Sequence, residues 1–167
     1  MRTSKIRGLP VLGIDDGVRV GAVDDLLIDT RARRVAALVL RTQTVNQWIP
    51  FDQLQRVGDD AVMVASAQVA QQASEQSPLG TLPSLRALLG LAVVDAAGKR
   101  WGKLEELSFD PTDGRITELA VRRSGVLGLG GGTETVPAAA VRSLGPDVVV
   151  VEARPVPPEA REPAGDP

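Results

Sequence analysis

Residues 98–122 read GKRWGKLEELSFDPTDGRITELAVR, and residues 17–41 read GVRVGAVDDLLIDTRARRVAALVLR. The second stretch lies 81 positions before the first, and several identical residues recur between the two. They are Gly17, Arg19, Gly21, Leu26, Asp29, Arg34, Leu38 and Arg41, which recur as Gly98, Arg100, Gly102, Leu107, Asp110, Arg115, Leu119 and Arg122. Repetition at a fixed spacing indicates a duplicated structural unit.

Each stretch predicts a pair of antiparallel strands. Residues 21–29 and 102–110 begin with glycine and end at aspartate, and in the second copy apolar and polar residues alternate in the pattern that buries one face of a strand. The sequence from Asp110 to Gly114 predicts a hairpin turn, because its proline fixes φ and its glycine accepts positive φ. Copy one has Arg33 where copy two has Gly114, so its hairpin is expected to differ or to be strained.

The repeat extends on both sides of these stretches. Residues 8–11 align with 90–93, and residues 50–64 align with 137–151 without a gap. The segments QWIPF and TETVP each predict a further strand, and AVMV and VVVV predict the last one. About five short strands per copy, at regular spacing, are typical of small barrels or sandwiches.

These patterns predict an all-β chain with two domains. Domain one covers residues 1–66 and domain two covers residues 84–153. Residues 67–83 form the linker, where Ala- and Gln-rich sequence leaves a short helix or a flexible link open, and proline and glycine then break any helix. The tail at 154–167 is rich in proline and charge, and is expected to be disordered.

The composition excludes several classes of chemistry. The 167 residues contain no His and no Cys, so His-dependent triads, thiol chemistry, disulfides and Cys-zinc sites are impossible. The formal net charge of −2 argues against a strongly basic nucleic-acid binder. No apolar run approaches the roughly 20 residues of a transmembrane helix, and no secretory signal is apparent. We therefore expect a cytoplasmic protein.

Each copy resembles a known family, the PRC-barrel domain. This small β-barrel is named after the cytoplasmic domain of the photosynthetic reaction-centre H subunit, and it also forms the C-terminal half of a bacterial ribosome-maturation factor. The residues that carry the resemblance in copy one are Ile6, Gly8, Val11, Asp16, Gly17, Gly21, Asp29, Arg34, Val35, Ile49 and Pro50. In copy two they are Leu88, Gly90, Val93, Gly98, Gly102, Asp110, Gly114, Arg115, Ile116, Val136 and Pro137.

The resemblance implies a non-enzymatic adaptor that binds a protein partner through a sheet edge, an apolar loop or the groove between the copies. The motifs themselves predict no catalytic residue, metal or cofactor, and an enzyme would require a pocket with strongly shifted carboxylate pKa values. The alternative is an accessory of ribosome maturation or RNA processing that acts through a ribosomal protein or RNA. Direct RNA contact is not expected, because exposed aromatic platforms are scarce. The open edges of small barrels also allow a homodimer.

Two groups of residues are candidates for partner binding. The glycine-rich loop at 125–132 fails the templates for phosphate cradles, but its apolar residues Val126, Leu127 and Leu129 suit a loop that covers a barrel mouth or touches a partner. Arg31, Arg33 and Arg34 form a basic cluster on the hairpin of copy one, where they either hold RNA phosphates or an acidic partner, or are solvated turn charges.

Four pairs of adjacent acids also occur in the sequence. They are Asp15–Asp16, Asp24–Asp25, Asp59–Asp60 and Glu105–Glu106. Adjacent residues on a strand point to opposite faces of the sheet, so the two members of a pair do not converge readily on one metal ion. The sequence therefore predicts turns and surface charge at these places rather than a metal site.

Overall fold

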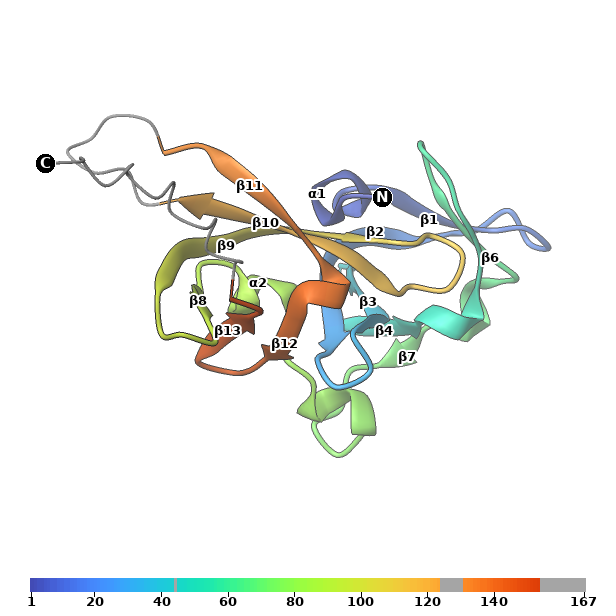
Figure 1. Ribbon diagram of the computed structural model, residues 1–167. Helices are drawn as coiled ribbons and strands as arrows, with labels where there is room; N and C mark the ends of the chain where they lie inside the picture. Colours follow the sequence, from blue (N-terminus) through green and yellow to red (C-terminus); the bar gives the residue numbers. More distant parts are fainter. Residues whose placement is uncertain (44, 124–130, 154–167) are drawn as a thin grey trace, which may run out of the picture.

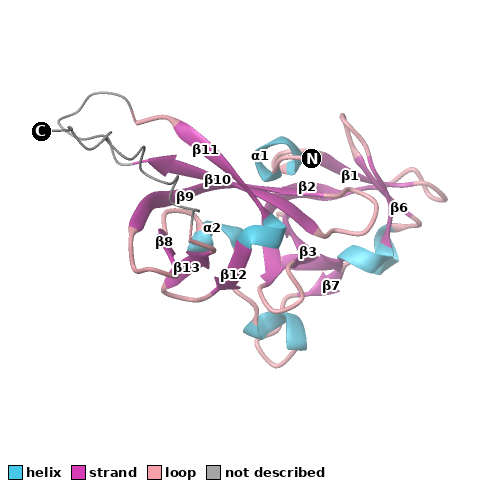
Figure 2. Ribbon diagram, in the orientation of Figure 1, coloured by secondary structure: helices cyan, strands magenta, loops and turns pink. Residues whose placement is uncertain are grey.

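The computed structural model describes residues 1–43, 45–123 and 131–153. These residues form two sheets, one for each copy of the repeat, which lie on either side of the molecule in Figure 1. Strands joined by turns and very short helices dominate the chain, as Figure 2 shows. The prediction of an all-β protein with two tandem domains is therefore confirmed.

Copy one supplies a seven-stranded sheet in the order β5–β6–β1–β2–β3–β4–β7. The strands are β1 (Pro10–Gly13), β2 (Arg19–Asp29), β3 (Arg34–Arg41), β4 (Gln47–Pro50), β5 (Leu54–Val57), β6 (Val62–Val64) and β7 (Gln71–Gln72). The 3-10 helix η1 (Phe51–Gln53) turns the chain from β4 into β5. Leu38 and Leu40 lie on either side of the more accessible Val39 and are completely buried, as the period of two predicts, and Ala37 is completely buried as well.

Copy two supplies a six-stranded sheet in the order β11–β10–β9–β8–β13–β12. The strands are β8 (Ala92–Asp95), β9 (Arg100–Phe109), β10 (Ile116–Arg123), β11 (Thr133–Pro137), β12 (Val141–Leu144) and β13 (Val148–Val151). The 3-10 helix η5 (Ala138–Ala140) occupies the place of η1. In each copy one parallel pair, β1 with β6 or β8 with β13, completes an otherwise antiparallel sheet.

The linker has regular structure of its own. The 3-10 helices η2 (Ala67–Val69) and η3 (Pro78–Thr81) flank β7, and the side chains of Ser66 and Ser77 accept hydrogen bonds at their N-termini. The helix α2 (Leu85–Leu88) follows and is capped by Ser84. The linker thus contains 3-10 turns and a short strand, where the sequence left a helix or a flexible link open.

Each copy packs its first helix on the sheet of the other copy. The helix α1 (Thr3–Ile6) packs on β9, and α2 packs on β2. The Phe109 amide donates to the Met1 carbonyl at 2.8 Å, and the Ile28 amide donates to the Pro83 carbonyl at 2.9 Å. Because Ile28 and Phe109 are aligned in the repeat, these reciprocal contacts relate the copies by an approximate twofold axis.

The two central hairpins meet near this axis. The Val35 amide donates to the Gly114 carbonyl at 2.8 Å, and the Ile116 amide donates to the Arg33 carbonyl at 2.9 Å. Gly114 has a φ of 77° and Arg33 has a φ of 54°. Each hairpin therefore has a residue with left-handed backbone at the equivalent position. A Cβ disfavours that conformation, so the backbone of Arg33 is strained by about 1 kcal/mol.

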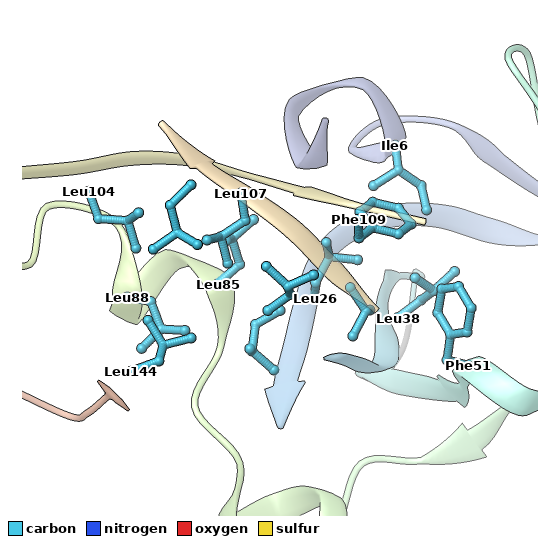
Figure 3. Close-up of a cluster of buried hydrophobic side chains, with 14 of the residues drawn as sticks. Ile6, Leu26, Leu38, Phe51, Leu85, Leu88, Leu104, Leu107, Phe109 and Leu144 are labelled. Atoms are coloured by element: carbon cyan, nitrogen blue, oxygen red, sulfur yellow. The ribbon is translucent and has the colours of Figure 1, made fainter. Parts of the chain in front are cut away.

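One hydrophobic cluster joins both copies (Figure 3). Phe51 of copy one meets Phe109 of copy two edge to face, with ring centroids 6.1 Å apart. Ile6 and Leu85, from the two exchanged helices, are both completely buried. The copies therefore form one folded unit. Within the described residues, no helix has the length and apolar character needed to span a bilayer.

Candidate functional site

Two arginines of the copy-one cluster, Arg33 and Arg34, face copy two. The Arg33 guanidinium donates to the carbonyl oxygens of Ala138 and Arg142 at 3.3 and 3.1 Å, and Arg34 donates to the Asp113 carbonyl at 3.2 Å. Both side chains are half-buried. Their contacts hold the copies together, and a contact with a partner stays a prediction. Arg31 is exposed, and its side chain has no hydrogen bond or ion pair within the described residues.

The other predicted partner contact, at Val126, Leu127 and Leu129, lies outside the described residues. A groove between the copies, about 540 Å³ in volume, is lined by Arg34, Phe51, Asp52, Asp113 and Arg115 among others. Its two arginines already contact Asp113, which forms an ion pair with Arg115 at 3.4 Å. The groove is therefore largely a site of contacts between the copies.

The adjacent acids serve local structure. Asp16 accepts hydrogen bonds from the amides of Val18 and Ala67, and these bonds, that to Val18 first, lower the pKa of its carboxyl. Asp24 forms ion pairs with Arg41 and Arg86. Among residues 1–43, 45–123 and 131–153, no three metal-ligating side chains are grouped closely enough to hold a metal ion.

The outer edge of copy one is covered by the linker. β7 pairs with β4, where Gln72 lies opposite Gln47 and Gln71 lies opposite Trp48. The Ala73 amide extends this pairing by donating to the Asn46 carbonyl at 3.0 Å. The chain thus adds its own extended segment to the edge of β4, and β7, which has two residues, becomes the end of the sheet.

The equivalent edge of copy two is open within the part of the chain that the structure describes. β11 pairs only with β10 and ends the sheet. The Arg123 amide donates to the Gly132 carbonyl at 3.0 Å, so the even-numbered residues of β11 direct their main-chain groups toward β10. Because these directions alternate in an antiparallel sheet, Thr133 and Thr135 direct theirs to the open side.

A polar hollow lies beside this open edge, on the outer face of copy two. Its volume is about 440 Å³. Its lining includes Arg2, Glu105, Glu106, Glu118, Ala120, Thr133 and Thr135. The last two belong to β11, so the hollow reaches the edge of the sheet. It therefore offers side-chain contacts next to main-chain groups that an added strand would use.

Two of the three carboxylates in the hollow are held by neighbouring donors. Glu106 accepts hydrogen bonds from the hydroxyls of Thr3 and Ser4, both at 2.6 Å. Glu105 forms an ion pair with Arg122 and accepts a bond from the Thr133 hydroxyl at 2.8 Å. The Arg122 guanidinium first, and Thr133 second, lower the pKa of Glu105, so this group is ionised at neutral pH.

The third carboxylate, Glu118, is exposed and has no hydrogen bond or ion pair within the described residues. Ala120 lies on the same face of β10, and its small side chain leaves the floor of the hollow open. This site was not predicted from the sequence, although the repeat alignment places the polar residues Glu118 and Thr135 opposite Ala37 and Trp48 of copy one.

The fold agrees with the comparison to known sequence families. The PRC-barrel domain matches residues 1–70 and again residues 84–156. Apart from β7, each matched segment contains the strands of one sheet. No curated protein matches the sequence. Because the two segments cover most of its length, the chain belongs to the PRC-barrel domain family and carries two tandem copies of that domain.

Proposed function

We propose that the protein is a non-enzymatic adaptor that binds an extended segment of a protein partner by adding it to β11. The observation that carries this proposal is the difference between two equivalent edges. β7 occupies the edge at β4, whereas β11 ends its sheet. The β4–β7 pair is a precedent within the chain for strand addition, a recurring mode of peptide recognition.

The described carboxyls whose pKa is shifted do not favour acid catalysis. A general acid that works near neutral pH needs a raised carboxyl pKa. Here the pKa values of Asp16, Asp95, Glu105 and Asp110 are all lowered, chiefly by hydrogen bonds. With no His and no Cys in the sequence, the usual nucleophile–base pairs are absent as well.

The alternative function is an accessory of ribosome maturation or RNA processing. In that case the partner would be a ribosomal protein or RNA. An acidic hollow repels phosphate, so the site favours a protein over RNA as the direct ligand. A protein of an RNA-containing particle remains compatible with strand addition. Treatment with RNase separates the two cases, since a partner held through RNA is released.

The test is a crosslinked pull-down of the tagged protein from its native host, with RNase, using two variants of one residue. Thr135→Pro removes the outward amide without removing a bond to β10, and Thr135→Val keeps that amide. We expect the pull-down to recover a discrete partner after RNase treatment. Thr135→Val should recover the same partner, and Thr135→Pro should not. A partner that Thr135→Pro retains as well as the wild type would overturn the proposal, provided that circular dichroism shows both variants folded.

A further inference from the structure

The side chains beside the open edge indicate which side chains a strand added to β11 would have. Directly opposite residues of neighbouring strands place their side chains on the same face of a sheet. Thr133 and Thr135 line the hollow on the outer face of copy two. A partner residue opposite Thr135 therefore places its side chain over the hollow, and so does every second residue along that strand.

The hollow is negatively charged at the place where those side chains would lie. Its lining contains three glutamates and one arginine, Arg2, and Arg122 is already bonded to Glu105. Glu118 is exposed and lies opposite Pro137 of β11. An added strand would lie two strand spacings from β10, about 10 Å, a gap that an extended Lys or Arg and an extended Glu can bridge.

One carboxylate of the lining, Glu118, is specific to copy two, whereas Glu105 and Glu106 align with Asp24 and Asp25 of copy one. Leu27 and Ala37 of copy one are 6% and 0% exposed, and the residues aligned with them are Ser108 and Glu118. The strand that covers the edge of copy one carries only Gln71 and Gln72, which are uncharged. The fold itself therefore does not require a carboxylate at the position of Glu118, and the segment that covers the edge of copy one is uncharged.

We infer that the partner segment is a basic extended strand, with Lys or Arg at alternate positions, that pairs with β11 and places these side chains over the hollow. This inference rests on the proposed strand addition. The chain's own residues 154–167 are a poor occupant. They contain five prolines, which lack the amide that pairing requires, and they carry three acids against two arginines.

The test measures the binding of short capped peptides to the full chain by titration calorimetry at low ionic strength. One peptide alternates lysine with valine, and the matched peptides replace lysine with threonine or with glutamate. We expect the lysine peptide to bind at least about tenfold more tightly than the glutamate peptide, because like charges oppose each other. Glu118→Gln should weaken the binding of the lysine peptide about threefold. Thr135→Pro should abolish binding, and Thr135→Val should not.

The outcomes separate this inference from the proposed function. Equal binding of the lysine and threonine peptides, lost in both cases with Thr135→Pro, would overturn the basic preference and leave strand addition standing. Equal binding of the lysine peptide to Thr135→Pro and to the wild type would show that charge attraction alone holds the peptide. That result would overturn both the strand addition and the basic strand. Failure of every peptide to bind would also contradict both.

Discussion

Arg33 contributes to the contact between the copies through both its backbone and its side chain. It holds a left-handed backbone with a φ of 54°, at the position that glycine occupies in copy two. Its side chain compensates for that strain by donating to Ala138 and Arg142 across the interface. The sequence predicted a different or a strained hairpin at Arg33, because the missing glycine is a local signal, and the structure shows the strained form. The sequence did not predict the two acceptors, which lie more than 100 positions away.

Two substitutions separate the strain from the side-chain contacts. Arg33→Ala loses both hydrogen bonds and keeps a Cβ at positive φ, whereas Arg33→Gly loses the same bonds and relieves the strain. We expect Arg33→Gly to be more stable than Arg33→Ala by about 1 kcal/mol in urea denaturation. An alanine variant as stable as the glycine variant would show that the turn is not left-handed in solution.

Asp95 gives a prediction about pH. The Trp101 indole N–H is the first cause that lowers the pKa of this buried carboxyl below its ordinary value of 3.8, and the Lys99 amide is the second. A lowered folded-state pKa stabilises the fold above pH 3.8, and this stabilisation is lost as the pH falls through the folded value. We expect Asp95→Asn to unfold at a lower midpoint urea concentration than the wild type at pH 7. This difference in midpoint should become smaller below pH 3.8. A difference independent of pH would contradict this.

At the scale of elements, the equivalent strands β4 and β11 differ in what lies beside them. Trp48 of β4 pairs with Gln71 of β7, whereas the main-chain groups of the aligned Thr135 point to the open side. We expect residue-resolved hydrogen exchange to show a protected Trp48 amide and a fast Thr135 amide. Equal protection of the two amides would mean that another part of the chain covers β11.

The strands themselves were predictable, and their environment was not. Alternation around Ser108 and the turn from Asp110 to Gly114 are local signals, and both hairpins form where these signals place them. The pairing of Gln71 and Gln72 with β4 joins residues that carry no strand signal and are more than 20 positions from their partners. An open or a covered edge depends on such distant pairing, so the sequence pattern alone does not reveal it.

At the scale of the whole molecule, the exchanged helices and the shared core make the copies unfold together. Trp48 reports on copy one and Trp101 on copy two. In the variants Trp101→Phe and Trp48→Phe, we expect the fluorescence of the remaining tryptophan to follow the same urea transition as far-UV circular dichroism. A tryptophan transition separated from the loss of strand signal would indicate that the copies unfold independently.

The proposed binding site is also a property of the whole molecule. The repeat alignment already placed Glu118 and Thr135 where copy one has Ala37 and Trp48, so polar replacement on one face was visible in the sequence. The hollow is also lined by Arg2, which directly precedes α1 and forms a bridge with Ser108 of copy two. Such a contact requires the exchange of helices between the copies, which no local pattern indicates.

The central claim is that a protein partner binds at β11, and site-specific photo-crosslinking tests it most directly. A benzophenone side chain is placed at Thr133 on the open edge or, in a second protein, at Arg31 on the hairpin of copy one. Both proteins are irradiated with host extract after RNase treatment. The account predicts that the partner is captured from Thr133 and not from Arg31. Capture from Arg31 alone would contradict it and move the binding site to the arginine hairpin.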